Sequence, residues 1–556
     1  MQNWTAAAYV FLLAVLSSWA APVVHPVVKE LGVPRMWLET RGTMAISTSS
    51  EKAAAHVKQG LALFSVPWDF EAYRHFCAAT EEDPDCLMAH WGVVMTLAGG
   101  NSEFLKERNA AGERLLTLLE RKNVPGTEME QRYALAAIQL LTDGSSTAGV
   151  SFLKIAQDYP NDVFSRLLGH FLMRNGYDEN GEPRVDQVKA SEALDQLRKE
   201  APQNASVQTW WISSLLEAPP SPAGLRTLRE EALPVLLRLV AEKPDFPPYQ
   251  LLLTHLQHQT GSFQAAVEAA EQAASLYEAY MQADGVTFYD CDGWVRTKLY
   301  QGHLLGLLGR YGPAVKIFED MARKEIQKER VLSRGASLVL WQGRTLGARV
   351  YAAGHNETQM KSGMRYLEKV PSEQWFPGLS LVGTYRDGLV LYLSARRAIL
   401  AKDMKAYPVL EGKLQERLEA MAGQRALAAR SSAYPEWLHA NQILTTFFHE
   451  LRGLAAQEKE GALQLAARNW FEAAVETQGH QANLLPPGIA YAMERRLALF
   501  ELYQGEKEDA LSAANDGLMK RPNEPGLLRA KFQALERLGQ EKEAAEVRKR
   551  LAAVLE

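Results

Sequence analysis

Five residues near the start of the chain follow a spacing that constrains the fold more than any other feature. Ala72, Phe76, Ala79 and Pro84 lie 12, 16, 19 and 24 residues after Gly60. Small residues at positions 60 and 72 let two antiparallel helices approach at the close end of the usual interaxial distance of about 8–10 Å. Phe76 and Ala79 share one face of the second helix, and the Pro84 ring cannot continue that helix. The spacing therefore predicts a helical hairpin that packs against a neighbour.

The same register returns, more weakly, along the rest of the chain. The clearest matching positions are Ala148, Phe152, Gly302, Ala314, Phe318, Ala510 and Ala544. Ala510 and Ala544 lie 34 residues apart, as do Ala232 and Ala266. A hairpin of this length cannot bury its apolar face alone, so a recurring unit predicts that neighbours stack into a superhelix.

A 34-residue helix–turn–helix unit with these offsets resembles the tetratricopeptide repeat. Within residues 56–98 the chain is similar to the opening repeat of a group of exported bacterial tetratricopeptide proteins of unknown function. Gly60-Leu61, the Asp83-Pro84-Asp85-Cys86 turn and the Ala89-His90-Trp91-Gly92 helix start carry this narrower resemblance. It implies an all-α, right-handed α-solenoid of tetratricopeptide-like repeats that binds proteins or peptides, and it supplies no catalytic residues.

Departures from the register divide the chain into five predicted segments. They are a signal peptide (1–20), an irregular leader (21–50), an N-terminal tetratricopeptide array (51–330), divergent helical repeats (331–450) and C-terminal tetratricopeptide units (451–556). The fourth segment is helical by pattern but keeps no clear register, so we expect divergent helix pairs there rather than a new fold.

The N-terminus predicts export. The apolar run Tyr9–Leu16 is too short to span a membrane, which takes about 20 apolar residues. Ser18 and Ala20 have the small side chains that signal peptidase accepts, so we expect cleavage after Ala20 and a periplasmic or extracellular protein. An ordinary or membrane-anchoring helix is the alternative, because no Lys or Arg precedes the run.

Cysteine and charge content restrict the chemistry. Cys77, Cys86 and Cys291 are too few for a disulfide framework. In an exported chain Cys77 and Cys86 could pair, but buried thiols that act as small apolar side chains are favoured. The net charge of −5 leaves no basic excess to neutralise phosphates, which argues against nucleic acid as a partner.

Candidate binding residues follow from the repeat geometry, in which first helices line a concave groove. The candidate peptide-binding residues are Tyr133, Ala137, Leu140, Leu251, His255, His258 and His303. His255 and His258 lie three residues apart and could share a metal ion, but solvated or hydrogen-bonded histidines are favoured. No catalytic motif is visible, and we predict no metal, no cofactor and no enzyme activity.

The sequence thus predicts a non-catalytic scaffold of the bacterial cell envelope that holds a protein or peptide in its groove. A subunit of a larger envelope assembly is a second possibility. A third is a glycan-binding protein or an enzyme that uses the helices as a frame, with its site in residues 331–450. The polar side chains available there are Tyr351, His355, Tyr385, Arg386, Asp387 and His439.

Overall fold

The computed structural model describes residues 23–38, 44–66, 68–99, 102–178, 181–369, 380–429, 434–459, 461–479 and 485–556. The predicted signal peptide and its cleavage after Ala20 lie outside the described residues. Within them the chain is helical, and no strand is present beyond one isolated bridge between Tyr177 and Pro183. The predicted all-α class is therefore confirmed.

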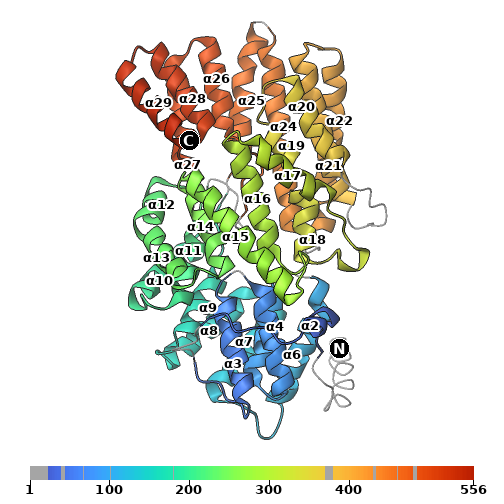
Figure 1. Ribbon diagram of the computed structural model, residues 1–556, viewed down its shortest axis with the longest axis vertical. Coiled ribbons are helices and arrows are strands. Elements are labelled where there is room, and N and C mark those ends of the chain that lie inside the picture. The colour runs from blue at the N-terminus through green and yellow to red at the C-terminus, as the bar shows by residue number, and fades with distance from the viewer. Residues whose placement is uncertain are drawn as a thin grey trace, which may run out of the picture. The chain divides into compact units, whose positions relative to one another are not determined.

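The chain divides into two compact units, which are described separately. The first comprises Met1–Ser214 and Gln282–Val286. It contains α2 (Pro26–Leu31), α3 (Glu51–Phe64), α4 (Asp69–Glu82), α5 (Leu87–Leu97), η1 (Ser102–Phe104), α6 (Leu105–Leu119), α7 (Glu128–Thr142), α8 (Ser145–Asp158), α9 (Val163–Met173), α10 (Val185–Glu200) and most of α11 (Ala205–Glu217) (Figure 1).

The second unit comprises Leu215–Met281 and Thr287–Glu556. Its first helices are α12 (Pro222–Thr227), η2 (Leu228–Ala232), α13 (Leu233–Glu242), α14 (Pro247–Gln259), most of α15 (Phe263–Asp284), α16 (Asp292–Leu307), α17 (Tyr311–Arg323), η3 (Lys328–Arg330), α18 (Arg334–Leu338), η4 (Val339–Gly343), α19 (Leu346–Tyr351) and α20 (Glu357–Glu368). It continues with α21 (Ser380–Leu400), α22 (Ala406–Gly423), α23 (Arg425–Ala428), α24 (Tyr434–Gln457), α25 (Ala462–Gln478), α26 (Met493–Gln504), α27 (Lys507–Lys520), α28 (Pro525–Arg537) and α29 (Glu541–Leu555).

The first predicted hairpin consists of α3 and α4. The Ser50 hydroxyl accepts a hydrogen bond from the Ala53 amide at 3.2 Å and so begins α3 at the N-cap. Phe76 on α4 is fully buried against two glycines: a Cβ on Gly60 in α3 would lie 2.6 Å from the ring, and a Cβ on Gly92 in α5 would lie 2.1 Å from it. One aromatic ring therefore joins the hairpin to the first helix of the next.

Aromatic rings continue this contact through the first unit. Trp91 lies 6.3 Å from Phe76 between ring centroids, Tyr133 lies 5.6 Å from Trp91, and Phe152 lies 5.3 Å from Tyr133. The four rings belong to α4, α5, α7 and α8. Edge-to-face pairs at such distances add to the burial of apolar surface, so successive hairpins share a continuous core.

The second unit repeats the same packing. Phe318 on α17 lies against Gly302 in α16, where a Cβ would approach its ring to 3.2 Å. Farther along, a Cβ on Gly453 would lie 2.6 Å from the Phe471 ring. Glycines with positive φ end the first helix of four hairpins, namely Gly261, Gly309, Gly505 and Gly539. A left-handed turn residue without a Cβ lets the chain reverse sharply there.

Part of the segment before α3 packs on the first hairpin. The Gln59 amide oxygen accepts a hydrogen bond from the Trp37 amide at 3.1 Å, and Glu71 accepts one from the Trp37 indole at 3.1 Å.

Cys77 and Cys86 are buried thiols that form no disulfide, as the favoured interpretation of the cysteines predicts.

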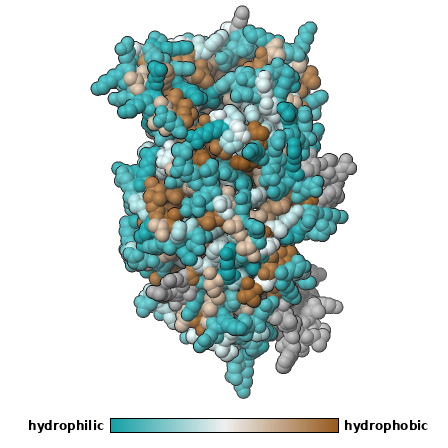
Figure 2. All heavy atoms as spheres, viewed as in Figure 1, coloured by the Kyte–Doolittle hydropathy of each residue, from teal (hydrophilic) through white to brown (hydrophobic). Residues whose placement is uncertain are grey.

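Hydrophilic side chains cover most of the face seen in Figure 2, and apolar groups occur there in small separate areas. In the part of the chain that the structure describes, no helix is both long and apolar enough to cross a bilayer.

Candidate functional site

A partly open cavity of about 290 Å³ lies in the second unit. Four segments that are distant in the sequence form it: the turn after α16, the turn between α19 and α20, the irregular stretch before α26 and the start of α28. Its volume lies just below the roughly 300–1,000 Å³ range of small-molecule pockets. The lining residues are Gly306, Leu307, Leu308, Gly309, Tyr311, Val350, Ala353, Gly354, His355, Gln359, Ala490, Tyr491, Arg495, Glu524, Pro525, Gly526 and Arg529.

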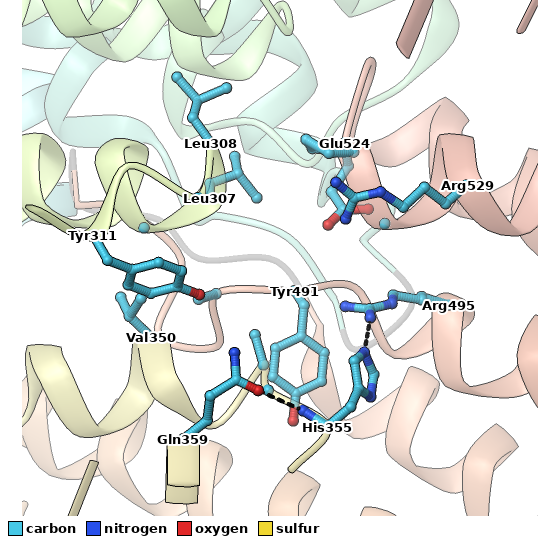
Figure 3. Close-up of a pocket in the computed structure, with 17 residues that line it drawn as sticks. Leu307, Leu308, Tyr311, Val350, His355, Gln359, Tyr491, Arg495, Glu524 and Arg529 are labelled. Carbon is cyan, nitrogen blue, oxygen red and sulfur yellow. Dashed lines mark hydrogen bonds between the residues drawn. The ribbon is translucent and has the colours of Figure 1, made fainter. Parts of the chain in front are cut away.

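The two sides of the cavity differ in chemistry. In Figure 3 Leu307, Leu308 and Tyr311 lie on one side, whereas Arg495 and Arg529 lie on the other. The arrangement offers an apolar surface opposite two guanidinium groups.

The start of α28 fixes the charged side. Pro525 begins the helix, and Glu524 accepts a hydrogen bond from the Leu527 amide at its N-cap, so one oxygen of this carboxylate serves the helix end. Gly526 lets the Arg495 side chain pass, because a Cβ there would lie 2.6 Å from Arg495 Cδ. Burial and the nearby Arg496 charge lower the pKa of Arg495 to about 10, and the group stays protonated at neutral pH.

A buried polar network lies beneath the cavity. Glu450 accepts hydrogen bonds from the Tyr392 hydroxyl at 2.6 Å, the Tyr491 hydroxyl at 2.8 Å and Arg496 Nε at 2.5 Å. Although burial alone would raise the pKa of Glu450, Arg496 and Arg396 outweigh it and hold that pKa below its usual value. The network therefore fixes Tyr491, which lines the cavity, and Arg496, which supports it.

His355 lies between two arginines at the edge of the cavity. Arg495 Nη2 contacts its Nε2, and Arg496 Nη1 lies 3.3 Å from its Nδ1. A neutral imidazole can accept at only one nitrogen, so only one of these contacts can be a good hydrogen bond. Burial and the two guanidiniums lower the pKa of His355 to about 3, which keeps the ring neutral.

The predicted groove residues lie elsewhere. Tyr133, Ala137, Leu251, His255 and His303 are buried in helix packing, and Leu140 and His258 are half-buried. Their contact with a peptide stays a prediction.

Two of the candidate histidines lie close together. The rings of His258 and His303 lie 5.2 Å apart, and burial with the nearby Arg521 lowers the pKa of His258 to about 3. No group of three or more His, Cys, Asp or Glu side chains among the described residues could hold a metal ion.

The residues named for a site in 331–450 do not gather in one place. Only His355 lines the cavity. Tyr385 is buried and stacks on Trp341, and His439 contacts Gln342 through its Nδ1 at 3.1 Å. Arg386 pairs with the adjacent Asp387 at 3.2 Å.

Sequence reasoning missed most of the cavity residues, including Tyr311, Tyr491, Arg495 and Arg529. The one available signal was the doublet Arg495-Arg496 at the start of a helix rich in apolar residues. Cations are unfavourable near the positive end of a helix dipole, so a pair of them there indicates a role other than helix stability.

The packing of two phenylalanines identifies the repeat type. Phe76 and Phe318 each lie 16 residues after the glycine that they contact, Gly60 and Gly302, as the sequence register predicts. The fold is an α-solenoid of tetratricopeptide-like hairpins.

Comparisons with known proteins add little beyond this. No protein-family model matches the chain, and neither does any curated protein. Among solved structures, a human IFIT1 dimer with m7Gppp-AAAA has a TM-score of 0.33 at 12% identity, over 84% of this chain and 90% of that one. A human IFIT1 dimer with PPP-AAAA has the same TM-score and identity, over 95% and 99%. The P58(IPK) TPR domain has a TM-score of 0.19 at 11% identity, over 88% and 99%. Likenesses of this size say nothing about a ligand.

Proposed function

We propose that the chain is a non-catalytic scaffold that binds a protein or peptide segment in the bacterial cell envelope. The stacked hairpins support this proposal, because such arrays present side chains from many successive helices on a long surface. The apolar run Tyr9–Leu16 and the small residues Ser18 and Ala20 support export.

The observation that carries the non-catalytic part is the chemistry of the cavity. Its described lining residues include no Ser, Thr, Cys or Lys, and Oε2 of its one carboxylate, Glu524, accepts from the Leu527 amide. The one imidazole, His355, faces guanidiniums on both nitrogens rather than a carboxylate that would orient it as a base. Groups arranged in this way bind and orient a ligand.

The test is a pull-down of the C-terminally tagged chain from its own cell envelope, with mass spectrometry of the bait and of the captured proteins. We expect the bait to begin at Ala21 and to retain a saturable protein partner at defined stoichiometry. A chain in which residues 1–20 are replaced by a single Met is the control, and it should miss that partner. Recovery of the bait from the cytosol with residues 1–20 still attached would contradict the proposed location. Failure to find a saturable partner in any fraction would contradict the scaffold function.

A further inference from the structure

The cavity in the second unit combines two kinds of surface that one small ligand could contact together. Leu307, Leu308 and Val350 offer aliphatic contacts, while Arg495 and Arg529 offer guanidinium donors on the opposite side (Figure 3). A molecule that fills the space would cover the apolar side with its body and reach the arginines with a polar end.

The charge of the cavity is unbalanced. In the described part of the chain, no carboxylate forms an ion pair with Arg495 or Arg529. Glu524 is the one acidic lining residue: its Oε2 accepts from the amide of Leu527, and its charge acts on Arg495. Two guanidiniums face a single carboxylate among the lining residues, and this excess of positive charge favours an added anion.

The hydrogen bonds of the arginines also leave room for an acceptor. Because His355 can accept from only one of Arg495 and Arg496, the other guanidinium faces a nitrogen that offers it no lone pair. Arg496 Nη2 is buried and has no hydrogen-bond partner among the described residues. An oxyanion next to Arg495 would replace its contact with His355 and leave the imidazole to accept from Arg496 alone.

The site is also held in place before any ligand arrives. Glu450 fixes Arg496 and Tyr491 from below, and Arg396 donates to the Gly354 carbonyl at 2.8 Å in the turn that carries His355. Preorganised donors lose little conformational entropy when an anion binds.

We propose that this cavity binds a small organic oxyanion with an apolar or aromatic body. The acid group contacts Arg495 and Arg529, and the body packs on Leu307, Leu308 and Val350. Carboxylate and phosphate acids share this chemistry. The site goes beyond the scaffold function, since it takes a small molecule whether or not a protein partner is bound.

The test is isothermal titration calorimetry of the mature full-length chain with four probes. 3-Phenylpropanoate and phenyl phosphate carry both features, 3-phenylpropanamide lacks the charge, and inorganic phosphate lacks the body. We expect at least one of the two aromatic acids to bind with a Kd of about 1 mM or below, and the tighter of the two distinguishes carboxylate from phosphate. The amide and inorganic phosphate should each bind at least about tenfold more weakly than the tighter aromatic acid, because each loses one set of contacts. Binding of 3-phenylpropanamide or of inorganic phosphate as tight as that of the tighter aromatic acid, or no binding of either aromatic acid, would overturn the proposal.

Variants then locate the binding. R495Q and R529Q should each weaken binding of the preferred acid by about tenfold or more, since a charge-assisted hydrogen bond is lost. R323Q is the matched control, because Arg323 lies on α17 with an exposed side chain outside the cavity, and it should bind as the unchanged chain does. Equal weakening in R323Q and R495Q would overturn the assigned location. If R495Q fails to fold, R529Q still tests the location of the site, and the four-probe series on the unchanged chain still tests the class of ligand.

Discussion

Phe76 shows how much one side chain contributes to an array of this kind. It is fully buried and touches glycines on two other helices, Gly60 and Gly92. Phe76→Ala removes the ring and leaves a cavity that these helices cannot close, so we expect a loss of about 3–5 kcal/mol in the free energy of unfolding. Urea unfolding followed by tryptophan fluorescence measures it, and a loss below about 1 kcal/mol would show that the register is wrong.

In the second unit, Glu450 is a buried polar residue on which several neighbouring side chains depend. It is fully buried and accepts from Tyr392, Tyr491 and Arg496. Glu450→Gln leaves Arg496 without its anion. We expect the free energy of unfolding to fall by about 3–5 kcal/mol, as it does when other buried ion pairs are broken. The control is Glu472→Gln, an exposed member of a surface pair, which should change stability by less than about 1 kcal/mol. Similar losses in both variants by urea unfolding would argue against the network.

At the residue scale, the sequence predicts packing better than it predicts the site. Gly60 and Phe76 are recognisable because their contact depends on a fixed spacing within one hairpin. The cavity joins His355 to Arg495, which are 140 residues apart, and no local pattern encodes such a contact. Long side chains on turns and helix ends can also point in many directions, so only the assembled structure shows that they converge.

Helix α5 provides an element-scale test of burial through pH. His90 is buried on this helix and contacts the Pro84 carbonyl at 2.9 Å, and burial lowers its pKa to about 4. Between about pH 6.5 and pH 4 the unfolded chain binds a proton at His90 that the folded chain does not bind. The contribution of neutral His90 to the free energy of unfolding is therefore fully present near pH 7. On acidification it falls by about 1.4 kcal/mol per pH unit.

His90→Gln should make the pH dependence of unfolding shallower, because the variant lacks this proton uptake and can still donate to the Pro84 carbonyl. Other buried histidines, such as His439, whose pKa is lowered to about 3, keep part of the slope. Urea midpoints at pH 7, 6 and 5 compare the two chains. Identical slopes would mean that His90 is not buried in the neutral form.

At the element scale, one irregular helix within residues 331–450 has a visible cause. Residues Val339–Gly343 form a π-helical turn between α18 and α19. A π turn inserts an extra residue into its helix and shifts the phase of the residues that follow within that helix, so the spacing of a regular hairpin does not apply across it. The helical character of the segment was still predictable because apolar periodicity within each helix survives.

At the scale of the whole molecule, the last hairpin covers apolar surface of the one before it. Ala530 of α28 packs with Ala498, Ala513 and Ala514 of α26 and α27. Deletion of residues 523–556 should expose this surface and cause aggregation, as the loss of a terminal repeat does in other arrays. Size-exclusion chromatography and a melting curve measure the outcome, and a monodisperse truncation with an unchanged melting profile would contradict a capping role.

The central claim is that each hairpin is completed by the next, and a double-mutant cycle between Phe76 and Gly92 tests it most directly. A Cβ on Gly92 would lie 2.1 Å from the Phe76 ring, so Gly92→Ala should cost about 1–3 kcal/mol in the unchanged chain. In the Phe76→Ala background the added methyl has space, and the same change should cost little or even stabilise. We predict a coupling of at least about 1 kcal/mol in urea unfolding, whereas costs that add within about 0.5 kcal/mol would contradict the stacking of α5 on the first hairpin.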